Sequence, residues 1–338
     1  MIIITDCLTE KVDEGCLKVA NSLVNRLKQS DSETSVISYG RQSKDTDTYL
    51  KLNKLFLNRR LFTEIRKHSG SILYIPFSSN TAASIFRTWV LSLFSGRKVA
   101  ALFALQHPMN RISEFLLRNG RFQIVALSQR SFSFYEKKAP GRVLYLKTGV
   151  DIQKFHPVSR AEKLQLKQKY GLDPEKPVVL HVGHLRSGRN VGVLTEIARD
   201  KQVVLVTSSV SEQDAKLRRQ LEQQENIRII DQYIPAIQEL YQLSDVYLFP
   251  VVEEENCIDV PLSVLEGAAC NIPIVTTAYG ELKELVGQPG FFFLETMDAS
   301  KLNDALDHML VRKDCGSRDV AKTYDWTDST AILKAWLE

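Results

Sequence analysis

Short runs of apolar and β-branched residues alternate along the chain with longer segments in which apolar residues recur at every third or fourth position. The short runs predict buried strands, and the longer segments predict amphipathic helices. In the first half, strands are predicted at 2–5, 34–38, 71–75, 99–105 and 123–127, and helices at 15–27, 49–67 and 81–94. In the second half, strands are predicted at 178–182, 203–207, 227–230, 246–249, 273–276 and 291–294, and helices at 191–199, 212–223, 236–242 and 261–270.

This alternation of strands and helices predicts an α/β fold built on parallel sheets. Parallel neighbours need a crossover between them, and the crossover is usually a helix. Two sheets are expected, because a single open sheet of a dozen strands is uncommon. The boundary is expected within 148–176, where Gly149 and Pro157 precede a stretch rich in Lys, Gln and Glu. The first strand is not followed by a G-x-G-x-x-G turn, which argues against a dinucleotide-binding dehydrogenase.

The composition is that of a globular protein. The chain has 338 residues, of which 44% are hydrophobic and 25% charged, and it contains no apolar run long enough to cross a membrane. The first six residues, MIIITD, do not resemble a signal peptide. Five cysteines without a C-x2-C pair argue against a zinc ribbon or a disulfide framework. We therefore expect a reducing compartment, the cytoplasm.

Charge is distributed unevenly between the two halves. Residues 1–150 contain 23 Lys and Arg against 11 Asp and Glu, whereas residues 151–338 contain 21 against 29. Within 51–150 the count is 17 against 3. This excess is typical either of a solvated basic face or of a surface attracted to phospholipid or nucleic acid. Because 49–67 mixes basic with apolar residues and no nucleic-acid motif is present, an anionic membrane surface is the favoured partner of the two.

Two glycine-containing loops are candidates for phosphate binding. The loop 183–190, GHLRSGRN, follows a predicted strand and carries Arg186 and Arg189, whose guanidinium groups match phosphate oxygens. A helix expected after this loop would add a partial positive charge. Gly15 opens the first predicted helix and allows a similar, weaker site. Neither loop has the spacing of a metal site.

A lone carboxylate occurs in the predicted helix after strand 246–249. Glu266 is surrounded in sequence by Val264, Leu265, Ala268 and Ala269. If buried, it needs a hydrogen-bonding partner, for which a ribose diol is suitable. Alternatively, Glu266 is exposed on the outer face of the helix, and this segment alone favours that interpretation.

Together these segments resemble a retaining glycosyltransferase of family 4 (group 1) with the GT-B architecture. TGVD with FHP at 148–157 resembles the inter-domain signature of the family, and VGHL at 182–185 with Arg189 resembles its VGRL…K motif. The segments 240–250 and 261–277 (PLSVLEGAACNIPIVTT) are similar to two further motifs. The resemblance implies two facing Rossmann-like domains, 1–152 for the acceptor and 153–324 for the nucleotide sugar. It also implies a final helix, about 325–338, that crosses back to the first domain.

The resemblance further implies the transfer of a sugar from a nucleoside-diphosphate sugar to a glycan or lipid-linked acceptor, with retention and without a metal or other cofactor. On matching positions, Arg189 would bind the diphosphate, Glu266 the ribose, and Gly15 and Gly183 the phosphate region. Tyr233 and Ile234 would meet the base. His107 falls near the family's active-site His and is assigned to catalysis as a positioning or polarising group.

Two positions depart from the family pattern. His184 replaces a phosphate-binding Arg, so Arg186 is expected to compensate or the binding to be weaker. Ile258 replaces a Glu that contacts the donor sugar. Asp259, which we assign to the catalytic group, or one of the acidic residues 253–255 is expected to take over this contact, and Glu255 is assigned to donor binding.

Two other functions share this architecture. A sugar-nucleotide 2-epimerase would convert its substrate without an acceptor. A non-catalytic carbohydrate- or partner-binding protein on the same scaffold would be consistent with the departures at His184 and Ile258.

Overall fold

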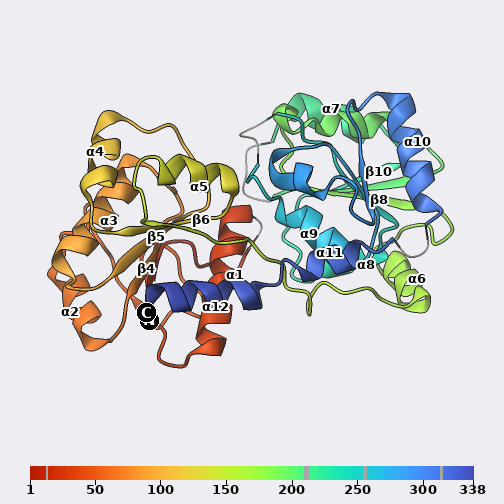
Figure 1. Ribbon diagram of the computed structural model, residues 1–338. Coiled ribbons are helices and arrows are strands. Elements are labelled where there is room, and N and C mark those ends of the chain that lie inside the picture. Colours follow the sequence, from red (N-terminus) through yellow and green to blue (C-terminus); the bar gives the residue numbers. More distant parts are fainter. Residues whose placement is uncertain (13, 209–212, 254–256, 313–314) are drawn as a thin grey trace. The chain divides into compact units, whose positions relative to one another are not determined.

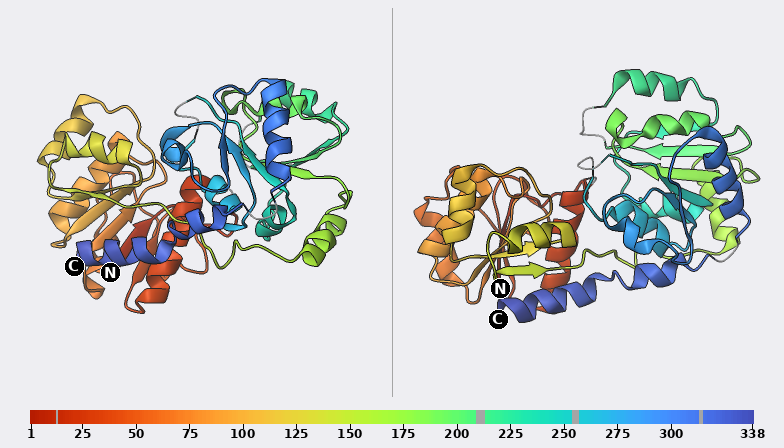
Figure 2. Two further views of the ribbon diagram at one scale, coloured as in Figure 1. Left: turned by 45° about the vertical axis from the view of Figure 1, so that its right-hand side comes forward. Right: turned by 45° about the horizontal axis from the view of Figure 1, so that its top comes forward.

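The computed structural model describes residues 1–12, 14–208, 213–253, 257–312 and 315–338. The chain divides into two compact units. Unit 1 comprises Met1–Thr148 and Trp326–Glu338, and unit 2 comprises Gly149–Asp325. Each unit has its own parallel sheet and its own hydrophobic core. Figure 2 shows the two units from two further directions.

Unit 1 is a doubly wound sheet with the strand order β3-β2-β1-β4-β5-β6-β7. Its elements are β1 Ile2–Thr5, α1 Gly15–Ser30, β2 Ser35–Ser38, β3 Thr48–Tyr49, α2 Arg59–Lys67, β4 Ile72–Ile75, α3 Ala82–Phe94, β5 Val99–Phe103, α4 Arg111–Asn119, β6 Gln123–Ala126, α5 Gln129–Glu136, β7 Val143–Tyr145 and, from the end of the chain, α12 Trp326–Leu337. The order reverses at β1 and β4, so right-handed crossovers place α1 on one face of the sheet and α3 on the other. Figure 1 shows α12 beside α1.

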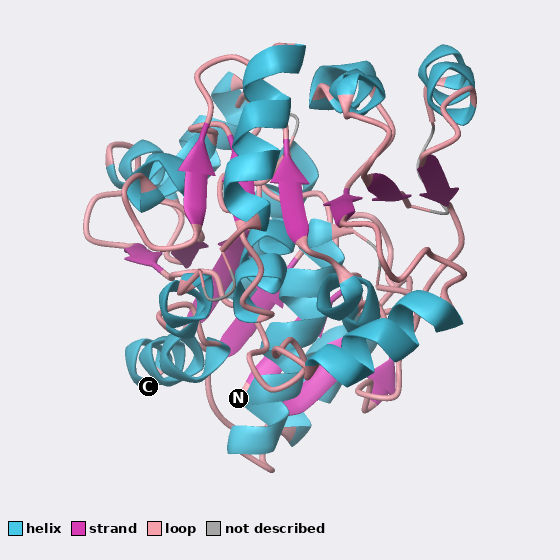
Figure 3. Cartoon of the chain, turned by 90° about the vertical axis from the view of Figure 1, so that its right-hand side faces the viewer, coloured by secondary structure: helices cyan, strands magenta, loops and turns pink. Residues whose placement is uncertain are grey.

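Unit 2 repeats this plan with the strand order β10-β9-β8-β11-β12-β13. Its elements are α6 Arg160–Lys169, β8 Val178–Val182, η1 Ser187–Arg189, η2 Val191–Glu196, β9 Gln202–Val206, α7 Ala215–Glu222, β10 Ile227–Ile230, α8 Gln238–Leu243, β11 Val246–Phe249, α9 Leu262–Ala269, β12 Ile274–Thr276, η3 Gly280–Leu285, β13 Phe291–Phe293, α10 Ala299–Leu310 and α11 Ser317–Lys322. Each pair of neighbouring strands in the described part of this sheet is parallel, as the alternation predicted. Figure 3 shows helices flanking the strands. Among the described helices, none is both long and apolar enough to span a bilayer.

The helix predicted at 49–67 is wrong over its first half. Residues 48–49 form the short strand β3, and α2 begins only at Arg59. Asn58 ends the intervening loop as an N-cap, and its side chain accepts a hydrogen bond from the Arg60 backbone N–H at 2.9 Å. Phe56 in this loop has a positive φ of 61° and is fully buried. A helix through this position would have to move the Phe56 ring out of the core.

The polar stretch expected between the domains contains a helix, α6. Ser159 caps its start in a capping box, because its hydroxyl accepts from the Glu162 N–H and the Glu162 carboxylate accepts from the Ser159 N–H. The sequence therefore contains the S-x-x-E pattern that marks the start of a helix. The division between the units falls at Thr148–Gly149, before α6, and α6 belongs to unit 2.

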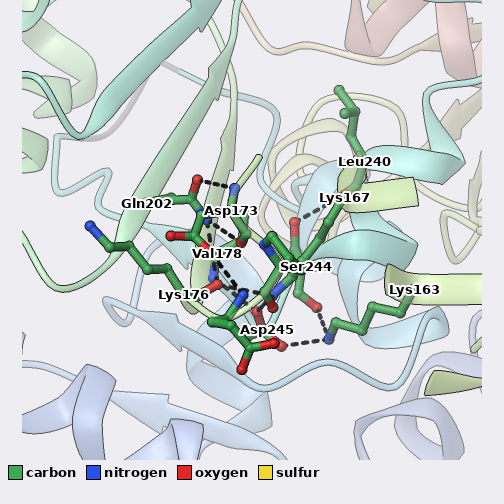
Figure 4. A network of polar contacts seen from close by, with 11 residues as sticks. Lys163, Lys167, Asp173, Lys176, Val178, Gln202, Leu240, Ser244 and Asp245 are labelled. Carbon is green, nitrogen blue, oxygen red and sulfur yellow. Dashed lines mark hydrogen bonds and ion pairs between the residues drawn. The ribbon is translucent and has the colours of Figure 1, made fainter. Parts of the chain in front are cut away.

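Two lysines of α6 hold one carboxylate at the start of β11 (Figure 4). The Asp245 carboxylate lies 2.7 Å from Lys163 Nζ and 3.0 Å from Lys167 Nζ, and it accepts the Val178 N–H at 2.8 Å. Lys167 is buried and also donates to the Lys176 carbonyl at 2.9 Å. Burial alone raises the pKa of Asp245, but the two lysines and the Val178 N–H outweigh it and hold the pKa below its usual 3.8. This network joins α6, β8 and β11 at the edge where these strands begin.

Candidate donor-binding site

The candidate residues of unit 2 gather where its strands end. Because β8, β11 and β12 are parallel, their carboxyl ends meet at one edge of the sheet. The loop 183–190 follows β8, the loop 250–261 follows β11, and α9 begins at the same edge. Ligands of open α/β sheets bind at this edge.

Backbone contacts fix the loop after β8. The Gly183 N–H donates to the Val206 carbonyl at 2.9 Å, and the Leu185 N–H donates to the Thr207 hydroxyl at 3.2 Å. Asn190 adopts a left-handed conformation with φ 54°, and its side-chain amide donates to the Pro250 carbonyl at 3.2 Å. The amide thereby ties this loop to the end of β11.

The α-helix predicted at 191–199 is wrong. Two short 3-10 helices, η1 and η2, occupy 187–196, and Asn190 interrupts them. The β-branched residues Val191, Val193 and Thr195 also lower the helix propensity of this segment. An α-helical dipole is therefore not a source of positive charge here, and the side chains must provide it.

Arg189 provides a cation in the loop after β8. Its side chain is half-buried, and its guanidinium interacts with the thiol of Cys257. Burial raises the pKa of Cys257, and the nearby guanidinium partly offsets this effect. Within the described ranges, Arg189 forms no ion pair with a carboxylate. A half-buried guanidinium without such an ion pair is suited to an anion from outside the chain.

His181 lies beside this cation and is fully buried. Its Nδ1 donates to the Leu248 carbonyl at 2.9 Å, which leaves Nε2 as the acceptor of a neutral ring. Burial, together with the charge of Arg189, lowers the pKa of His181 to about 4. A Cβ on Gly183 would lie 2.7 Å from His181 Nε2 and 3.6 Å from Arg189 Nη1. Only glycine at 183 therefore lets the His181 ring approach the loop, whereas a Cβ would make an ordinary contact with the guanidinium.

The loop after β11 is fastened to the segment after β12. The Tyr279 hydroxyl donates to the Cys257 carbonyl at 2.7 Å and accepts the Cys257 N–H at 3.0 Å. The Asp259 carbonyl accepts the Glu281 N–H at 2.9 Å. At Gly280, which has φ 51°, a Cβ would come within 2.4 Å of this carbonyl. Ile258 and Asp259 are half-buried, and Glu255 lies outside the described residues.

Glu266 is buried, so the prediction of an exposed position is wrong. Its carboxylate accepts a hydrogen bond of 2.6 Å from the hydroxyl of Tyr241 on α8. Burial and the charge of Glu266 raise the pKa of Tyr241 well above its usual value. Tyr247 lies close to this carboxylate, and its hydroxyl donates to the Val182 carbonyl at 3.3 Å.

Removing the hydroxyl of Tyr241 is expected to destabilise the fold around Glu266. Tyr241→Phe removes a short hydrogen bond to the buried carboxylate, which is expected to lower the free energy of unfolding by about 1–3 kcal/mol. Urea denaturation followed by circular dichroism measures the change. Tyr170→Phe is the matched control, because Tyr170 donates to Glu239 at 2.8 Å in a less buried place. Equal effects of the two substitutions would contradict the prediction.

The other predicted donor residues lie around this edge with different exposure. Arg186 is exposed and His184 is half-buried, both in the loop after β8. Tyr233 and Ile234 are half-buried between β10 and α8, and Ile234 packs against the core. Their roles toward a nucleotide remain predictions.

The two predicted residues of unit 1 lie at the carboxyl edge of its own sheet. Gly15 is half-buried as the first residue of α1. His107 is exposed in the loop after β5. The buried Asn80 side chain accepts the His107 N–H at 2.7 Å and donates to the His107 carbonyl at 2.9 Å. This reciprocal pair fixes the backbone that carries the imidazole.

Sequence reasoning missed several partners of the site. Cys257, Tyr279, Tyr241 and His181 were not identified as parts of the site. Among the described residues, no group of three or more His, Cys, Asp or Glu is placed to hold a metal ion. The missed contacts join residues far apart in sequence, so no local pattern indicates them.

In comparison with known proteins, the family match falls within the second unit. Residues 176–312 match the family described as "Glycosyl transferases group 1". Over 206 residues the chain is 24% identical to the sulfoquinovosyl transferase SQD2 of Arabidopsis thaliana, covering 55% of this chain and 38% of that protein. It is 27% identical over 219 residues to the D-inositol 3-phosphate glycosyltransferase of Geodermatophilus obscurus, covering 58% of this chain and 47% of that protein. The chain thus aligns with less than half the length of these relatives.

The fold is shared over a much longer range. The structure of HepE from Anabaena in complex with UDP-glucose is 14% identical and has a TM-score of 0.79, with 99% of this chain and 98% of that chain covered. The predicted α/β fold with two Rossmann-like domains is therefore confirmed, as is the resemblance to the family. Residues 176–312 thus resemble group 1 glycosyltransferases, and the chain that carries them has the two-domain GT-B fold.

Proposed function

We propose that this protein transfers a sugar from a nucleoside-diphosphate sugar to an acceptor, with retention of configuration. The observation that carries the proposal is the half-buried Arg189 guanidinium at the carboxyl edge of unit 2, which forms no ion pair with a carboxylate of the described residues. The diphosphate of the donor has the charge and the oxygen geometry that this group can bind. The match of residues 176–312 to group 1 glycosyltransferases supports the same chemistry.

In this proposal the residues of unit 2 stabilise the departing nucleotide. Negative charge develops on the diphosphate as the bond to the sugar breaks, and Arg189 is placed to offset it, with Arg186 and His184 in the same loop. Glu266 would bind the ribose hydroxyls, because a carboxylate can accept hydrogen bonds from Tyr241 and from a ligand together. Asp259 would contact the sugar. The proposal assigns charge stabilisation to arginine and requires no metal or other cofactor.

The acceptor is assigned to unit 1. His107 would polarise or position the acceptor, and Gly15 would approach the donor phosphate. The proposed acceptor is a glycan or a lipid-linked molecule, and the excess of basic residues at 51–150 supports an anionic membrane surface as a further partner. We place the protein in the cytoplasm, peripheral on the inner face of the membrane. The five cysteines, which form no disulfide in the described structure, support a reducing compartment.

A nucleotide screen tests the donor site directly. UDP, GDP and ADP are each added to the full chain, and the melting temperature is measured. One of them is expected to raise it, since a ligand present at about 100 times its Kd adds about 2.7 kcal/mol of stability. UDP is the first choice, because HepE was solved with UDP-glucose. The matching nucleoside, which lacks the diphosphate, is the control and should raise the melting temperature much less. No shift with any of the three nucleotides would contradict the proposal.

The fate of the donor separates the alternative functions. The nucleotide sugar selected by the screen is incubated with the protein and followed by proton NMR. A transferase leaves the donor largely intact until an acceptor is added. Conversion to an epimer without an acceptor would identify a 2-epimerase, and binding without any turnover in the presence of varied glycan and lipid acceptors would identify a non-catalytic scaffold.

A further inference from the structure

Helix α4 of unit 1 exposes large apolar side chains to solvent. Ile112 is 69% exposed and Phe115 is 63% exposed. The two residues are three positions apart, so they are neighbours on one face of the helix. A surface helix ordinarily places such residues toward the core and polar residues outward. This outward pair, which we call the α4 ridge, is therefore a candidate contact surface.

The orientation of α4 is fixed, so the α4 ridge cannot turn inward. Ser113 and Leu117 form its buried face. At the start of the helix, the Asn110 side chain accepts the Ser113 N–H at 2.8 Å. At the end, Gly120 packs so closely that a Cβ would come within 2.3 Å of the Phe122 ring. Figure 1 shows α4 beside α3, on which it packs.

Arg142 also fastens the end of the helix. Its guanidinium donates to the carbonyls of Leu117 at 2.7 Å, Arg118 at 3.0 Å and Phe122 at 3.2 Å, and to that of Gly120. These carbonyls include the last ones of α4, which lack partners within the helix. The ridge is therefore presented by a rigid element.

The charges around the α4 ridge are positive. Arg111, Arg118 and Arg121 are all exposed. The acidic residue of the helix, Glu114, is neutralised by Lys138 at 2.5 Å. Exposed apolar side chains with arginines beside them match the interface of an anionic bilayer, where the rings and methyl groups enter the acyl region and the guanidinium groups meet phosphates.

The α4 ridge also lies close in sequence to a candidate site. Ile112 follows His107 by five residues, and α4 begins directly after the loop that Asn80 fixes. We propose that α4 docks on anionic phospholipid with Ile112 and Phe115 inserted, and that a lipid-linked acceptor reaches the His107 loop from this membrane. The part that concerns the acceptor rests on the proposed transferase function, whereas docking itself does not.

Vesicle binding tests the docking without any turnover. The full chain is mixed with sucrose-loaded vesicles of phosphatidylcholine containing phosphatidylglycerol, and the bound fraction is measured after sedimentation. Ile112→Ser with Phe115→Ser is expected to lower the partition coefficient about 100-fold, or roughly tenfold per inserted side chain. Val311→Ser is the control, because Val311 is 78% exposed on unit 2 and outside the ridge. A double variant that binds as the wild type does would overturn the proposal.

The arginines give a second, independent measurement. Arg111→Gln with Arg118→Gln is expected to lower the partition coefficient about 20-fold on anionic vesicles, and Arg199→Gln on unit 2 should leave it unchanged. The proposal would be overturned if the wild type bound vesicles of pure phosphatidylcholine as strongly as vesicles that contain phosphatidylglycerol. Binding to RNA but not to vesicles would also overturn it. Because donor binding is measured separately by the nucleotide screen, a failure of docking is distinguishable from a failure of the proposed function.

Discussion

Asp245→Asn is expected to lower the free energy of unfolding of unit 2 by about 3 kcal/mol. The substitution removes the carboxylate that lies within 3.0 Å of both Lys163 and Lys167, and it leaves the buried Lys167 ammonium without a counter-charge. Breaking a buried ion pair from one side is costly, because the remaining charge stays desolvated. Hydrogen exchange of peptides that cover β8 and β11 measures the loss where the network lies.

The control for this prediction is a solvent-exposed ion pair on the same unit. Asp319→Asn removes the partner of Lys322, and both of these side chains are largely exposed, so the cost is expected to stay below about 1 kcal/mol. The tryptophans, Trp89, Trp326 and Trp336, all belong to unit 1. Their fluorescence therefore follows unit 1 and should change little with Asp245→Asn. Equal costs for the two Asp→Asn changes would contradict the prediction.

The same carboxylate predicts a dependence of stability on pH. The pKa of Asp245 is lower in the folded state than its usual 3.8, so the stability it contributes is present above that value and is lost as the pH falls through the folded pKa. The wild-type unit should therefore lose stability more steeply below about pH 4 than the Asp245→Asn variant. The expectation would be contradicted if the stabilities of the two proteins, measured by hydrogen exchange, fell equally with pH down to pH 3.

The sequence predicted the sheets well because buried parallel strands are read from short apolar runs. β8 and β11 consist of such runs, and the only interruption in them that could mislead is His181, whose ring is buried and neutral.

The helices were harder to predict. α4 was missed because it places Ser113 inside and Ile112 and Phe115 outside, the reverse of the usual amphipathic pattern. A failure of this kind is expected at surfaces that serve a function other than folding.

The candidate site was predictable only in part, for a related reason. The loop around Arg189 stands out by its composition, because two arginines and two glycines follow an apolar strand. The environment of Arg189 cannot be predicted from this composition. It depends on Cys257, which belongs to a loop well over sixty residues later in the chain. Likewise, Glu266 was expected to need a partner, but its pairing with Tyr241 is a contact between two helices that no periodicity indicates.

Arg189→Ala is expected to lower the rate of sugar transfer about 100- to 1,000-fold. The substitution removes the guanidinium that the proposal places against the departing diphosphate, and the cost of losing such a preorganised donor is of this size. Arg189→Lys should restore part of the rate, because an ammonium keeps the charge but loses the two-pronged geometry. The rate is measured with the donor that the nucleotide screen selects, and the affinity for the corresponding nucleoside diphosphate is measured by calorimetry.

A control variant and a control ligand show whether the effect of Arg189→Ala is specific to the diphosphate. Arg199→Ala, which removes an exposed arginine of the same unit after η2, should leave both rate and affinity unchanged. The affinity of Arg189→Ala for the bare nucleoside should also stay near that of the wild type, because the lost contact concerns only the phosphates. The melting temperature should be unaffected, since Arg189 forms no ion pair with any described carboxylate. A variant that turns over within twofold of the wild type would remove Arg189 from the mechanism, because the leaving group would then be stabilised elsewhere.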